Sequence, residues 1–511
     1  MMQKTTAVLE IGSSGIRLLI ANINTGTELF DILENESKPT MLGSDVFLHG
    51  MVSLPVINEC VETLHVYKEL LQSYGLHVRQ VHVIATSALR EASNKDNFVD
   101  IVLMRTGFKI KILEDLEENH YMYFAVMHAL TRESENLTAK NAMVIETGGG
   151  STEILLIKKG QIEAVHSFQL GTIRIASAVQ AVDGFPESIN RIIQDQVSTI
   201  VSKLNAELPL QSIEHVIIMG SDARLLASTE HVDFYDTYWK LTTQEFITNS
   251  EKLAQYSEMQ CIQQFDIDAC DAVTMRYGLL ILREFIRHTH ADTVFIPVYS
   301  MREGFLLSLV VSEKNKIQNE LKKHIVASAR SIGKKFHFDE NHANWVRKNM
   351  LKLFDSLEFI HHLSKRDRLL AEIAALLHDI GVYIRSGSHH KHSEYIISNS
   401  EIFSISNEER IMIACIARYH RKGGPNPSHA NFMYLDKADR IRVLKLSALL
   451  RIADVLDHNH NQSIRVVSAE RKSNTIIIYT DNPYELSLLK QDIEKKADIF
   501  EYVYGYSLTV V

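Results

Sequence analysis

Short apolar runs alternate with longer amphipathic stretches along the first part of the chain. The predicted elements are strands within residues 6–34, 81–86 and 109–114, and helices over 55–74, from 87 onward and over 116–130. The helical segments show apolar residues at the 3.6-residue period, whereas the strand segments are short and bounded by turn residues. Strands that alternate with helices in this way indicate an α/β lobe.

The same alternation starts again near Lys140. It predicts a strand–turn–strand unit, helices within 172–205, strands at 215–219 and 293–296, and a helix over 302–311. The polar run 312–323 predicts either a domain boundary or a solvated helix. Residues 325–456 then predict helices throughout, and from 464 onward strand patterns return, as at 475–480, with one helix between them. We therefore predict domains at 1–130, 131–312, 313–460 and 461–511.

Two segments share one arrangement of strand, acid, glycine turn and strand: Ala7 to Ile20 and Val144 to Ile154. Glycine turns can point several backbone N–H groups inward and so bind anionic oxygens. The residues predicted for this role are Gly12, Ser13 and Ser14 in the first turn and Gly148, Gly149, Gly150 and Ser151 in the second. The alternative is a pair of hairpins whose glycines serve only the turns.

Composition narrows the class of protein. The chain has 511 residues with 45% hydrophobic and 23% charged side chains, which is typical of a globular protein of several domains. Its net charge of −9 argues against nonspecific nucleic-acid binding. No apolar run is long enough to span a bilayer, and the N-terminus lacks a signal-peptide profile. Four scattered cysteines (Cys60, Cys261, Cys270, Cys415) indicate reduced thiols and a cytoplasmic location.

Arginines and a carboxylate cluster accompany the glycine turns. Arg17 and Arg174 lie in or just after the glycine segments, and Arg90 follows a predicted strand end, so each is a candidate phosphate ligand or a surface ion-pair partner. Residues 113–119 place four carboxylates at a helix start. They either complement the helix dipole or supply a general base that activates water.

Taken together, these segments resemble the exopolyphosphatase/guanosine pentaphosphatase family. The resemblance runs in order over nearly the whole chain. Its motifs are matched here by Glu10 to Leu18, Ala85 to Arg90, Glu117-Glu118-Asn119, Glu146 to Glu153 and Met301 to Gly304.

The resemblance implies two ribonuclease H-like lobes of the actin, sugar kinase, acetate kinase and heat-shock chaperone superfold. It implies stepwise removal of the terminal phosphate of polyphosphate, or of the 5′ γ-phosphate of pppGpp, with Glu118 as the catalytic base. Magnesium would be held by Glu10, Glu146 and Glu153. The phosphate-binding residues would be those of the two turns together with Arg17 and Arg90. A homodimer is implied by the resemblance alone.

The chain departs from the family pattern at several points. Glu10 and Glu146 stand where the family has aspartate, Ser14 and Gly15 replace Asn-Ser, and Asp222 follows a turn that is glycine-rich in the family. Each longer side chain moves its carboxylate about one C–C bond further into the cleft. These departures favour an alternative: a catalytically weak protein that binds pppGpp, ppGpp or polyphosphate.

The helical third domain is rich in histidine. Its apolar helix ends in an adjacent His-Asp pair, which resembles the signature of HD-type metal phosphohydrolases. The predicted ligands in chain order are His342, His378, Asp379, His392, His420 and Asp454. Such a set suits Mn²⁺, Fe²⁺ or Zn²⁺ and has enough ligands for two ions. The alternatives are an inherited site with a structural role and a second phosphohydrolase activity toward a nucleotide.

Basic residues also gather in this domain: Arg418, Arg421, Lys422, Lys437, Arg440, Arg442 and Lys445. They predict either solvated helix faces or a channel that guides polyphosphate toward the cleft.

Overall fold

The computed structural model describes residues 3–24, 29–133, 139–180, 186–229, 232–265, 267, 269–310, 316–421 and 423–511. The chain divides into two compact units, Met1–Leu321 and Lys322–Val511. The predicted boundary at 312/313 falls outside the described residues, and the division into four domains stays a prediction.

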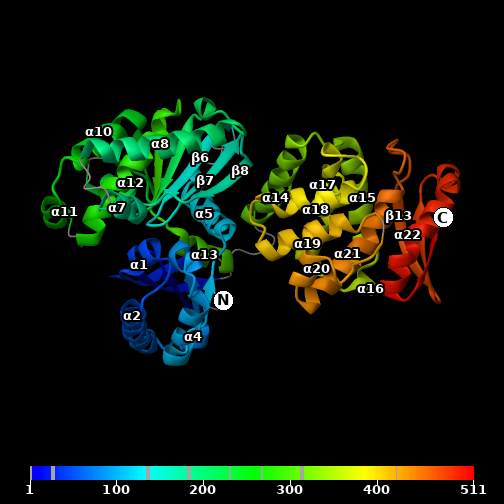
Figure 1. Cartoon of the computed structure of the whole chain (residues 1–511), viewed down its shortest axis with the longest axis horizontal. Helices are drawn as coiled ribbons and strands as arrows, with labels where there is room; N and C mark the ends of the chain where they lie inside the picture. The colour runs from blue at the N-terminus through cyan, green and yellow to red at the C-terminus, as the bar shows by residue number, and fades with distance from the viewer. Residues whose placement is uncertain are drawn as a thin grey trace. The chain divides into compact units, whose positions relative to one another are not determined.

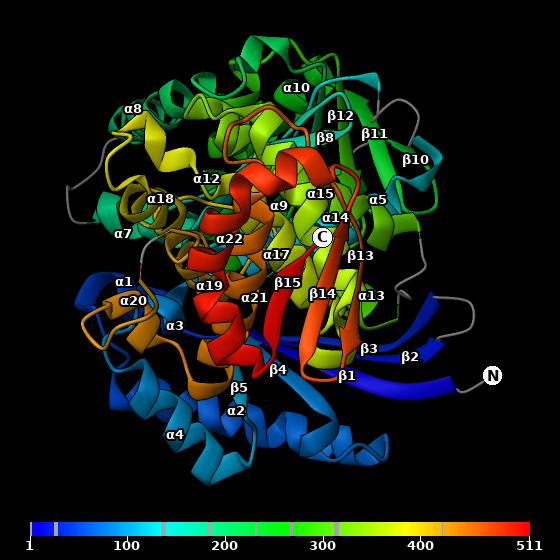
Figure 2. The same cartoon turned by 90° about the vertical axis from the view of Figure 1, so that its right-hand side faces the viewer.

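The first sheet of the N-terminal unit has the strand order β3-β2-β1-β4-β5. Its strands are β1 (Gln3–Ile11), β2 (Gly15–Asn24), β3 (Leu29–Pro39), β4 (Val81–Ala85) and β5 (Ile110–Ile112). The first three are antiparallel, and β4 and β5 continue parallel to β1. Helices α2 (Leu54–Ser73) and α4 (Lys95–Thr106) cover one face, and α13 (Met301–Val310) covers the other (Figures 1 and 2).

The second sheet repeats this order and extends it. Its strands run β10-β11-β12-β9-β6-β7-β8, so β8-β7-β6-β9-β12 corresponds to β3-β2-β1-β4-β5. The strands are β6 (Ala142–Thr147), β7 (Thr152–Lys158), β8 (Gln161–Phe168), β9 (His215–Met219), β10 (Asp233–Phe234), β11 (Tyr238–Thr242) and β12 (Thr293–Pro297). The repeat seen in the sequence as two turns is therefore a repeat of five strands.

Further helices of this unit surround the sheets. They are α1 (Leu42–His49), α3 (Ser87–Glu91), α5 (Asp115–Ala129), α7 (Thr172–Gln180), α8 (Pro186–Asn205), α9 (Ser221–Thr229), α10 (Thr243–Ala254), α11 (Glu258–Phe265) and α12 (Ala269–Arg287). Residues of α8, α10 and α12 bury their apolar faces against the second sheet, which they cover in Figure 1. The apolar periodicity of these helices explains their burial.

The C-terminal unit is a helical body with a small sheet. Its helices are α15 (Glu340–Ser356), α16 (Glu358–His361), α17 (Lys365–Leu377), α18 (His389–Ser398), α19 (Asn407–Arg418), α20 (Ala430–Tyr434), α21 (Lys437–Val455) and α22 (Pro483–Tyr504), with the short η4 (Ile380–Tyr383) after α17. Strands β13 (Val466–Lys472), β14 (Thr475–Thr480) and β15 (Ser507–Val510) form the sheet beside α22 (Figure 2). Helix α14 (Lys316–Lys335) includes the described part of the predicted polar run.

The structure bears on two features read from the sequence, the membrane-spanning potential of the helices and the state of the cysteines. In the described part of the chain, no helix combines the length and the apolar character needed to cross a membrane. Cys60, Cys261 and Cys415 are free thiols, whereas the side chain of Cys270 lies outside what the structure describes.

Candidate functional site

The two glycine turns meet at one cavity of about 140 Å³, which we call the turn cavity. Its lining includes Ser13 from the first turn, Gly149 from the second, and Glu118 from α5. The turns lie against each other, since a Cβ placed on Gly149 would come 3.0 Å from the Cβ of Ser13. Glu118 is only 8% exposed and belongs to this cavity rather than to the bulk solvent. The structure thus brings both turns and the predicted base together.

Both turns close in the same way. The N–H of Gly12 donates to the carbonyl of Gly15, and the N–H of Gly148 donates to the carbonyl of Ser151, each over 2.9 Å. These two N–H groups are therefore engaged within the turns, so the predicted role of Gly12 and Gly148 as N–H donors to a ligand needs correction. Both residues still line the cavity.

Gly150 belongs to the second turn but does not line the turn cavity. A Cβ there would collide with the ring of Phe47, which explains why the position holds glycine. The predicted cradle residues that remain at the cavity with ligand-binding groups are Ser13, Ser14, Gly149 and Ser151.

Arg90 contacts the predicted base. Its guanidinium donates to the carboxylate of Glu118 over 2.5 Å and to the carbonyl of Leu113 over 2.7 Å. Arg90 does not line the turn cavity. Its predicted role as a phosphate ligand is therefore corrected to that of a positioning residue for Glu118.

The turn cavity contains more acidic than basic side chains. Six carboxylates line it, from Glu10, Glu118, Glu146, Glu153, Asp222 and Asp271, together with three guanidinium groups, from Arg17, Arg224 and Arg302. An anion would meet net negative charge here unless protons or cations offset it. Atom Nη1 of Arg224 is buried and has no hydrogen-bond partner among the described residues.

The three predicted magnesium ligands do not converge as a ready-made site. Glu10 pairs with Arg17 at 3.6 Å and with Arg302 at 3.4 Å. Glu153 accepts hydrogen bonds from Asn119 at 3.1 Å and Ser167 at 2.8 Å. Among the described residues, groups of three His, Cys, Asp or Glu ligand atoms within metal-binding range occur only in the C-terminal unit.

Sheet register explains the different partners of these acids. Glu10 lies opposite Arg17 in the first hairpin, whereas Glu146 lies opposite Glu153 in the second. Directly opposed like charges are unfavourable. Burial raises the pKa of Glu146 to about 7, and the charges of Glu10 and Glu118 act in the same direction.

Arg174 has a structural role. It donates to the carbonyl of Gly150 over 2.5 Å, forms an ion pair with Glu91, and stacks over the ring of Phe47 at 4.0 Å. It therefore ties the second turn to α3 and α1 instead of facing the turn cavity.

Several cavity residues were not predicted as site residues. They are Thr86, Ser87, Thr147, Thr172, Gly220, Ser221, Asp222, Arg224, Asp271, Thr274, Ser300, Met301 and Arg302. Arg302 lies within the Met301–Gly304 motif, and Arg224 follows the Gly220 turn. Both residues therefore belong to recognised sequence segments, but the sequence analysis gave neither of them a role in the site. Asp271 and Thr274 sit inside a helix with no local motif.

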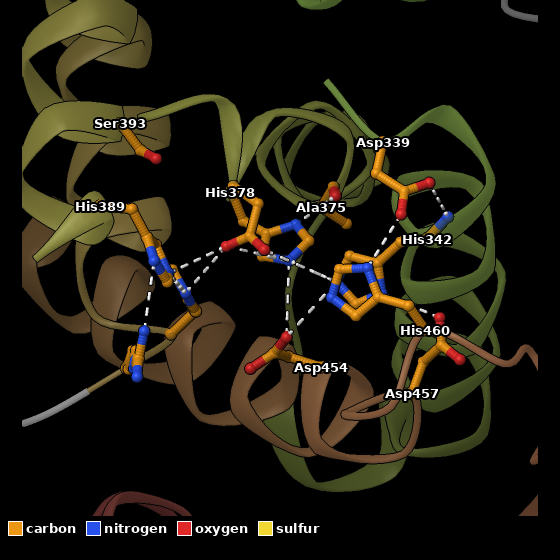
Figure 3. Close-up of polar contacts among 12 residues, drawn as sticks. Asp339, His342, Ala375, His378, His389, Ser393, Asp454, Asp457 and His460 are labelled. Atoms are coloured by element: carbon orange, nitrogen blue, oxygen red, sulfur yellow. Dashed lines mark hydrogen bonds and ion pairs between the residues drawn. The ribbon is translucent and has the colours of Figure 1, made fainter. Parts of the chain in front are cut away.

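The second candidate site is in the C-terminal unit. His342, His378, Asp379, His389, His420 and Asp454 converge there, and we call them the histidine cluster (Figure 3). The Nε2 atoms of His342 and His378 lie 3.2 Å apart, and those of His389 and His420 lie 3.1 Å apart. Asp379 lies between the two pairs, 3.1 Å from His389 and 3.8 Å from His342.

The Nδ1 atoms of these histidines form hydrogen bonds outside the cluster, so the Nε2 atoms point their lone pairs into it. Nδ1 of His378 donates to the carbonyl of Ala375 and Nδ1 of His420 to that of Ala417. His389 bonds in the same way to Ser386, and His342 donates to the carboxylate of Asp457. Such bonds fix the tautomer with Nε2 as an acceptor.

Acceptor atoms that converge in this way favour a positive charge between them, which is either a proton on an imidazole or a metal ion. Atom Oδ1 of Asp379 is buried and has no hydrogen-bond partner in the described structure. Burial alone would lower the pKa of His378, but Asp379 and Asp454 outweigh it and raise that pKa to about 9. The donor set of imidazoles and carboxylates therefore fits a transition-metal ion.

The prediction of His392 as a member of this ligand set needs correction. The structure places His389, and not His392, beside Asp379 and His420. The two residues lie three positions apart on α18, and only His389 shows this convergence. His460 also stacks on His342 at 3.7 Å, and neither His460 nor Asp457 was predicted.

The basic residues of this unit mostly have local partners. Arg418 pairs with Glu394, Arg442 pairs with Asp367 and Asp439, and Lys445 donates to the carbonyl of His361. Lys422 lies outside the described residues. These contacts favour structured helix faces over a channel.

Comparison with known proteins gives relatives over most of the chain. At 22% identity it matches a guanosine-5′-triphosphate,3′-diphosphate pyrophosphatase of Pseudoalteromonas translucida, covering 88% of this chain and 86% of that protein. A protein of the same name from Vibrio vulnificus is 21% identical, with 96% of each covered. The crystal structure of an exopolyphosphatase from Cytophaga hutchinsonii superimposes with a TM-score of 0.54 at 17% identity, covering 61% of this chain and 99% of that one.

Family models match both units. Residues 19–313 match the model of the Ppx/GppA phosphatase family, and residues 326–501 match the model of Ppx/GppA phosphatase domain III. The first match alone spans more than half of the chain, and the superposition shows a shared fold over 61% of the chain. The chain therefore belongs to the Ppx/GppA phosphatase family.

Proposed function

We propose that the turn cavity hydrolyses phosphoric anhydrides and releases the terminal phosphate of inorganic polyphosphate or the 5′ γ-phosphate of pppGpp. The observation that carries this proposal is that both turns, three guanidinium groups and Glu118 line one cavity. Relatives named pyrophosphatase and exopolyphosphatase support this class of reaction.

The residues divide the work by their chemistry. Hydroxyl groups of Ser13 and Ser151, with the guanidinium groups of Arg17 and Arg224, bind phosphate oxygens. A water molecule attacks the terminal phosphorus, the bond to the bridging oxygen breaks, and Glu118 takes the proton of the water. Arg90 holds Glu118 in place for this step. Positive groups stabilise the charge on the leaving phosphate chain.

Magnesium fits this cavity in a different way from the predicted trio. Glu146 is the member of the trio for which the described residues offer no hydrogen bond or ion pair. Magnesium is often held by one or two carboxylates together with substrate phosphate oxygens and water. Glu146 would hold the ion with the substrate, and the bound ion would neutralise charge on the transferred phosphoryl group.

The test is phosphate release from inorganic tripolyphosphate with Mg²⁺. We expect Glu118→Gln to lower kcat about 10²–10⁴-fold, because the base is lost. Glu117→Gln is the matched control, since glutamine preserves the helix cap at the same helix start. Equal release by Glu118→Gln and the unchanged protein would contradict the proposal.

A catalytically weak binding protein is the alternative in another class. The two arginine partners of Glu10 favour it, because they engage a carboxylate predicted to hold metal. Tight binding of tripolyphosphate by the unchanged protein, without phosphate release, would support this alternative.

We further propose that the histidine cluster binds one or two Mn²⁺, Fe²⁺ or Zn²⁺ ions and forms an HD-type phosphohydrolase site for a nucleotide. The inward Nε2 atoms and the buried oxygen of Asp379 support the metal site. A metal bound there would lower the pKa of a bound water and so supply a nucleophile.

Two neighbouring histidines give a matched test of the histidine cluster. We expect His389→Ala to lose metal, measured by elemental analysis of the purified protein, and His392→Ala to keep it. If the histidine cluster carries the main chemistry, replacing His378 and Asp379 by alanine would abolish phosphate release. If the turn cavity carries it, the same replacement would leave phosphate release unchanged. A homodimer and a cytoplasmic location stay predictions.

A further inference from the structure

A cleft lies where strands β4 and β5 begin, and we call it the basic cleft. It has a volume of about 350 Å³ and is lined by residues of β4, β5, α13 and the short helix η1 (Val78–Gln80). Val81 and His82, the first residues of β4, line the basic cleft, whereas Thr86 and Ser87, which follow β4, line the turn cavity. Among the described residues, none lines both spaces, so the basic cleft is a separate candidate site.

The charge of its lining distinguishes the basic cleft. Three cationic side chains line it, those of Arg79, Lys109 and Lys111, and no acidic side chain is found among its described lining residues. By contrast, the whole chain has a net charge of −9, and six carboxylates line the turn cavity. Burial lowers the pKa of His82, so this imidazole is mostly neutral at pH 7. The three cations therefore give the cleft a local positive charge, which favours an anion.

Two of the three cations are available to a ligand. Lys111 forms an ion pair with Glu117. The side chains of Arg79 and Lys109 are exposed and form no hydrogen bond or ion pair with other described residues. An anion in the basic cleft can therefore pair with Arg79 and Lys109 without breaking an existing ion pair.

The basic cleft also has apolar walls. Val78, Val81 and Phe305 contribute to them. The imidazole of His82 packs against Phe305, with ring centroids 5.3 Å apart. Small-molecule sites combine such surface with a few polar groups in a volume of about 300–1,000 Å³. An inorganic anion would leave the apolar walls in contact with water, so a ligand with an apolar body fits the cleft better.

Lysines near an edge strand have another possible use. Strand β5 lies at one end of the first sheet, and lysines on edge strands discourage pairing with other chains. This use accounts for Lys109 and Lys111. It does not account for Arg79, which lies on η1, or for the apolar walls, which a protected sheet edge does not need.

We infer that the basic cleft binds a small organic anion, in which one charged group is attached to an apolar, aromatic body. Arg79 and Lys109 hold the charged group. Val78, Val81 and Phe305 pack against the apolar body. The inference does not depend on the proposed hydrolysis, because the residues of the basic cleft do not line the turn cavity.

Three probes separate the two parts of the ligand. Cinnamate has both the charge and the aromatic body, cinnamamide has only the body, and acetate has only the charge. We expect cinnamate to bind the full chain saturably in isothermal titration calorimetry without Mg²⁺ or polyphosphate. Cinnamamide and acetate should each bind at least about tenfold more weakly. No saturable binding of cinnamate, or equal binding of cinnamate and cinnamamide, would overturn the inference.

Two double variants locate the site. Arg79→Gln with Lys109→Gln should weaken cinnamate binding at least about tenfold, because both available cations are lost. Arg191→Gln with Lys203→Gln is the matched control, since it removes the same charge from exposed positions on α8 of the same unit. The control should bind cinnamate like the unchanged protein. Equal weakening by both double variants would mean that cinnamate responds only to net charge, and equal binding by all three proteins would place it elsewhere; either result would overturn the inference.

Discussion

At the residue scale, the contact between Arg90 and Glu118 decides the role of the arginine. Because Arg90 holds the base and does not line the turn cavity, Arg90→Met should lower kcat and leave KM for tripolyphosphate nearly unchanged. Steady-state phosphate release measures both constants. Arg90→Lys should recover part of kcat, since it restores a positive partner. A raised KM with unchanged kcat would instead make Arg90 a phosphate ligand.

The half-buried acid Asp222 predicts a pH dependence of stability. Burial raises the pKa of Asp222 from 3.8 to about 7, and the charge of Asp271 adds to this while Arg224 opposes it. Between about pH 4 and 7 the folded state thus binds more protons than the unfolded state, so the free energy of unfolding contributed by this group falls as pH rises.

Asp222→Asn removes that titration. We expect the variant to gain free energy of unfolding relative to the unchanged protein as pH rises from 5 to 8, measured by urea denaturation without metal or phosphate. Asp31→Asn at an exposed position is the control and should follow the unchanged protein. Parallel pH profiles for Asp222→Asn and the unchanged protein would contradict the raised pKa.

Some site residues were predictable from local sequence and others were not. Ser13 and Gly149 were predicted because the glycine turns mark them, and Glu118 was predicted because the family resemblance names it among the carboxylates at the helix start. His392 was chosen over His389 because both lie in one histidine-rich run, and only the phase of α18 decides which imidazole faces Asp379. Arg90 was predicted as a site residue, but its ion pair with Glu118 was not predicted. That contact depends on how the end of β4 and the start of α5 lie relative to each other, which the sequence does not show.

At the element scale, the packing of α13 on α5 fixes the position of the base. A Cβ on Gly304 would collide with the backbone carbonyl of Tyr121, three residues after Glu118. Gly304→Ala should therefore push α5 and cost about 1–3 kcal/mol, because a backbone atom cannot rotate away. Ser308→Ala on the same helix should change stability by less than about 0.5 kcal/mol.

Denaturation and phosphate release together measure this effect. Gly304→Ala should lower kcat as well as stability, since α5 carries Glu118. A variant as stable and as active as the unchanged protein would show that the two helices can separate without cost.

Most elements near the turns were predictable, and those far from them were less so. Both hairpins and helices α2 and α5 follow the predicted ranges because their apolar periodicity is strong. Strands β10 and β11 at one end of the second sheet were missed, since β10 is only two residues long and neither strand has the alternation of a longer strand. The five-strand repeat could be recognised only once strand order was known.

At the scale of the whole molecule, each of the two compact units buries apolar residues of its own. The clusters around Ile145 and Leu9 lie in the N-terminal unit, while residues such as Leu370 and Leu449 are buried in the C-terminal unit. Each unit also carries its own candidate site, the turn cavity in one and the histidine cluster in the other. Ligands of the two sites should therefore stabilise different units.

Calorimetry of the full chain should separate the two units into two unfolding transitions. A ligand at 100 times its Kd adds about 2.7 kcal/mol to the unit that binds it. For the unit Lys322–Val511 that corresponds to a shift in Tm of about 5–11 °C, and for the larger unit Met1–Leu321 the shift should be smaller. Tripolyphosphate should raise one transition and Mn²⁺ in the absence of tripolyphosphate the other, and His378→Ala should remove only the Mn²⁺ shift. One transition raised by both ligands would mean that the units unfold as a single body, because a ligand then stabilises the whole chain wherever it binds.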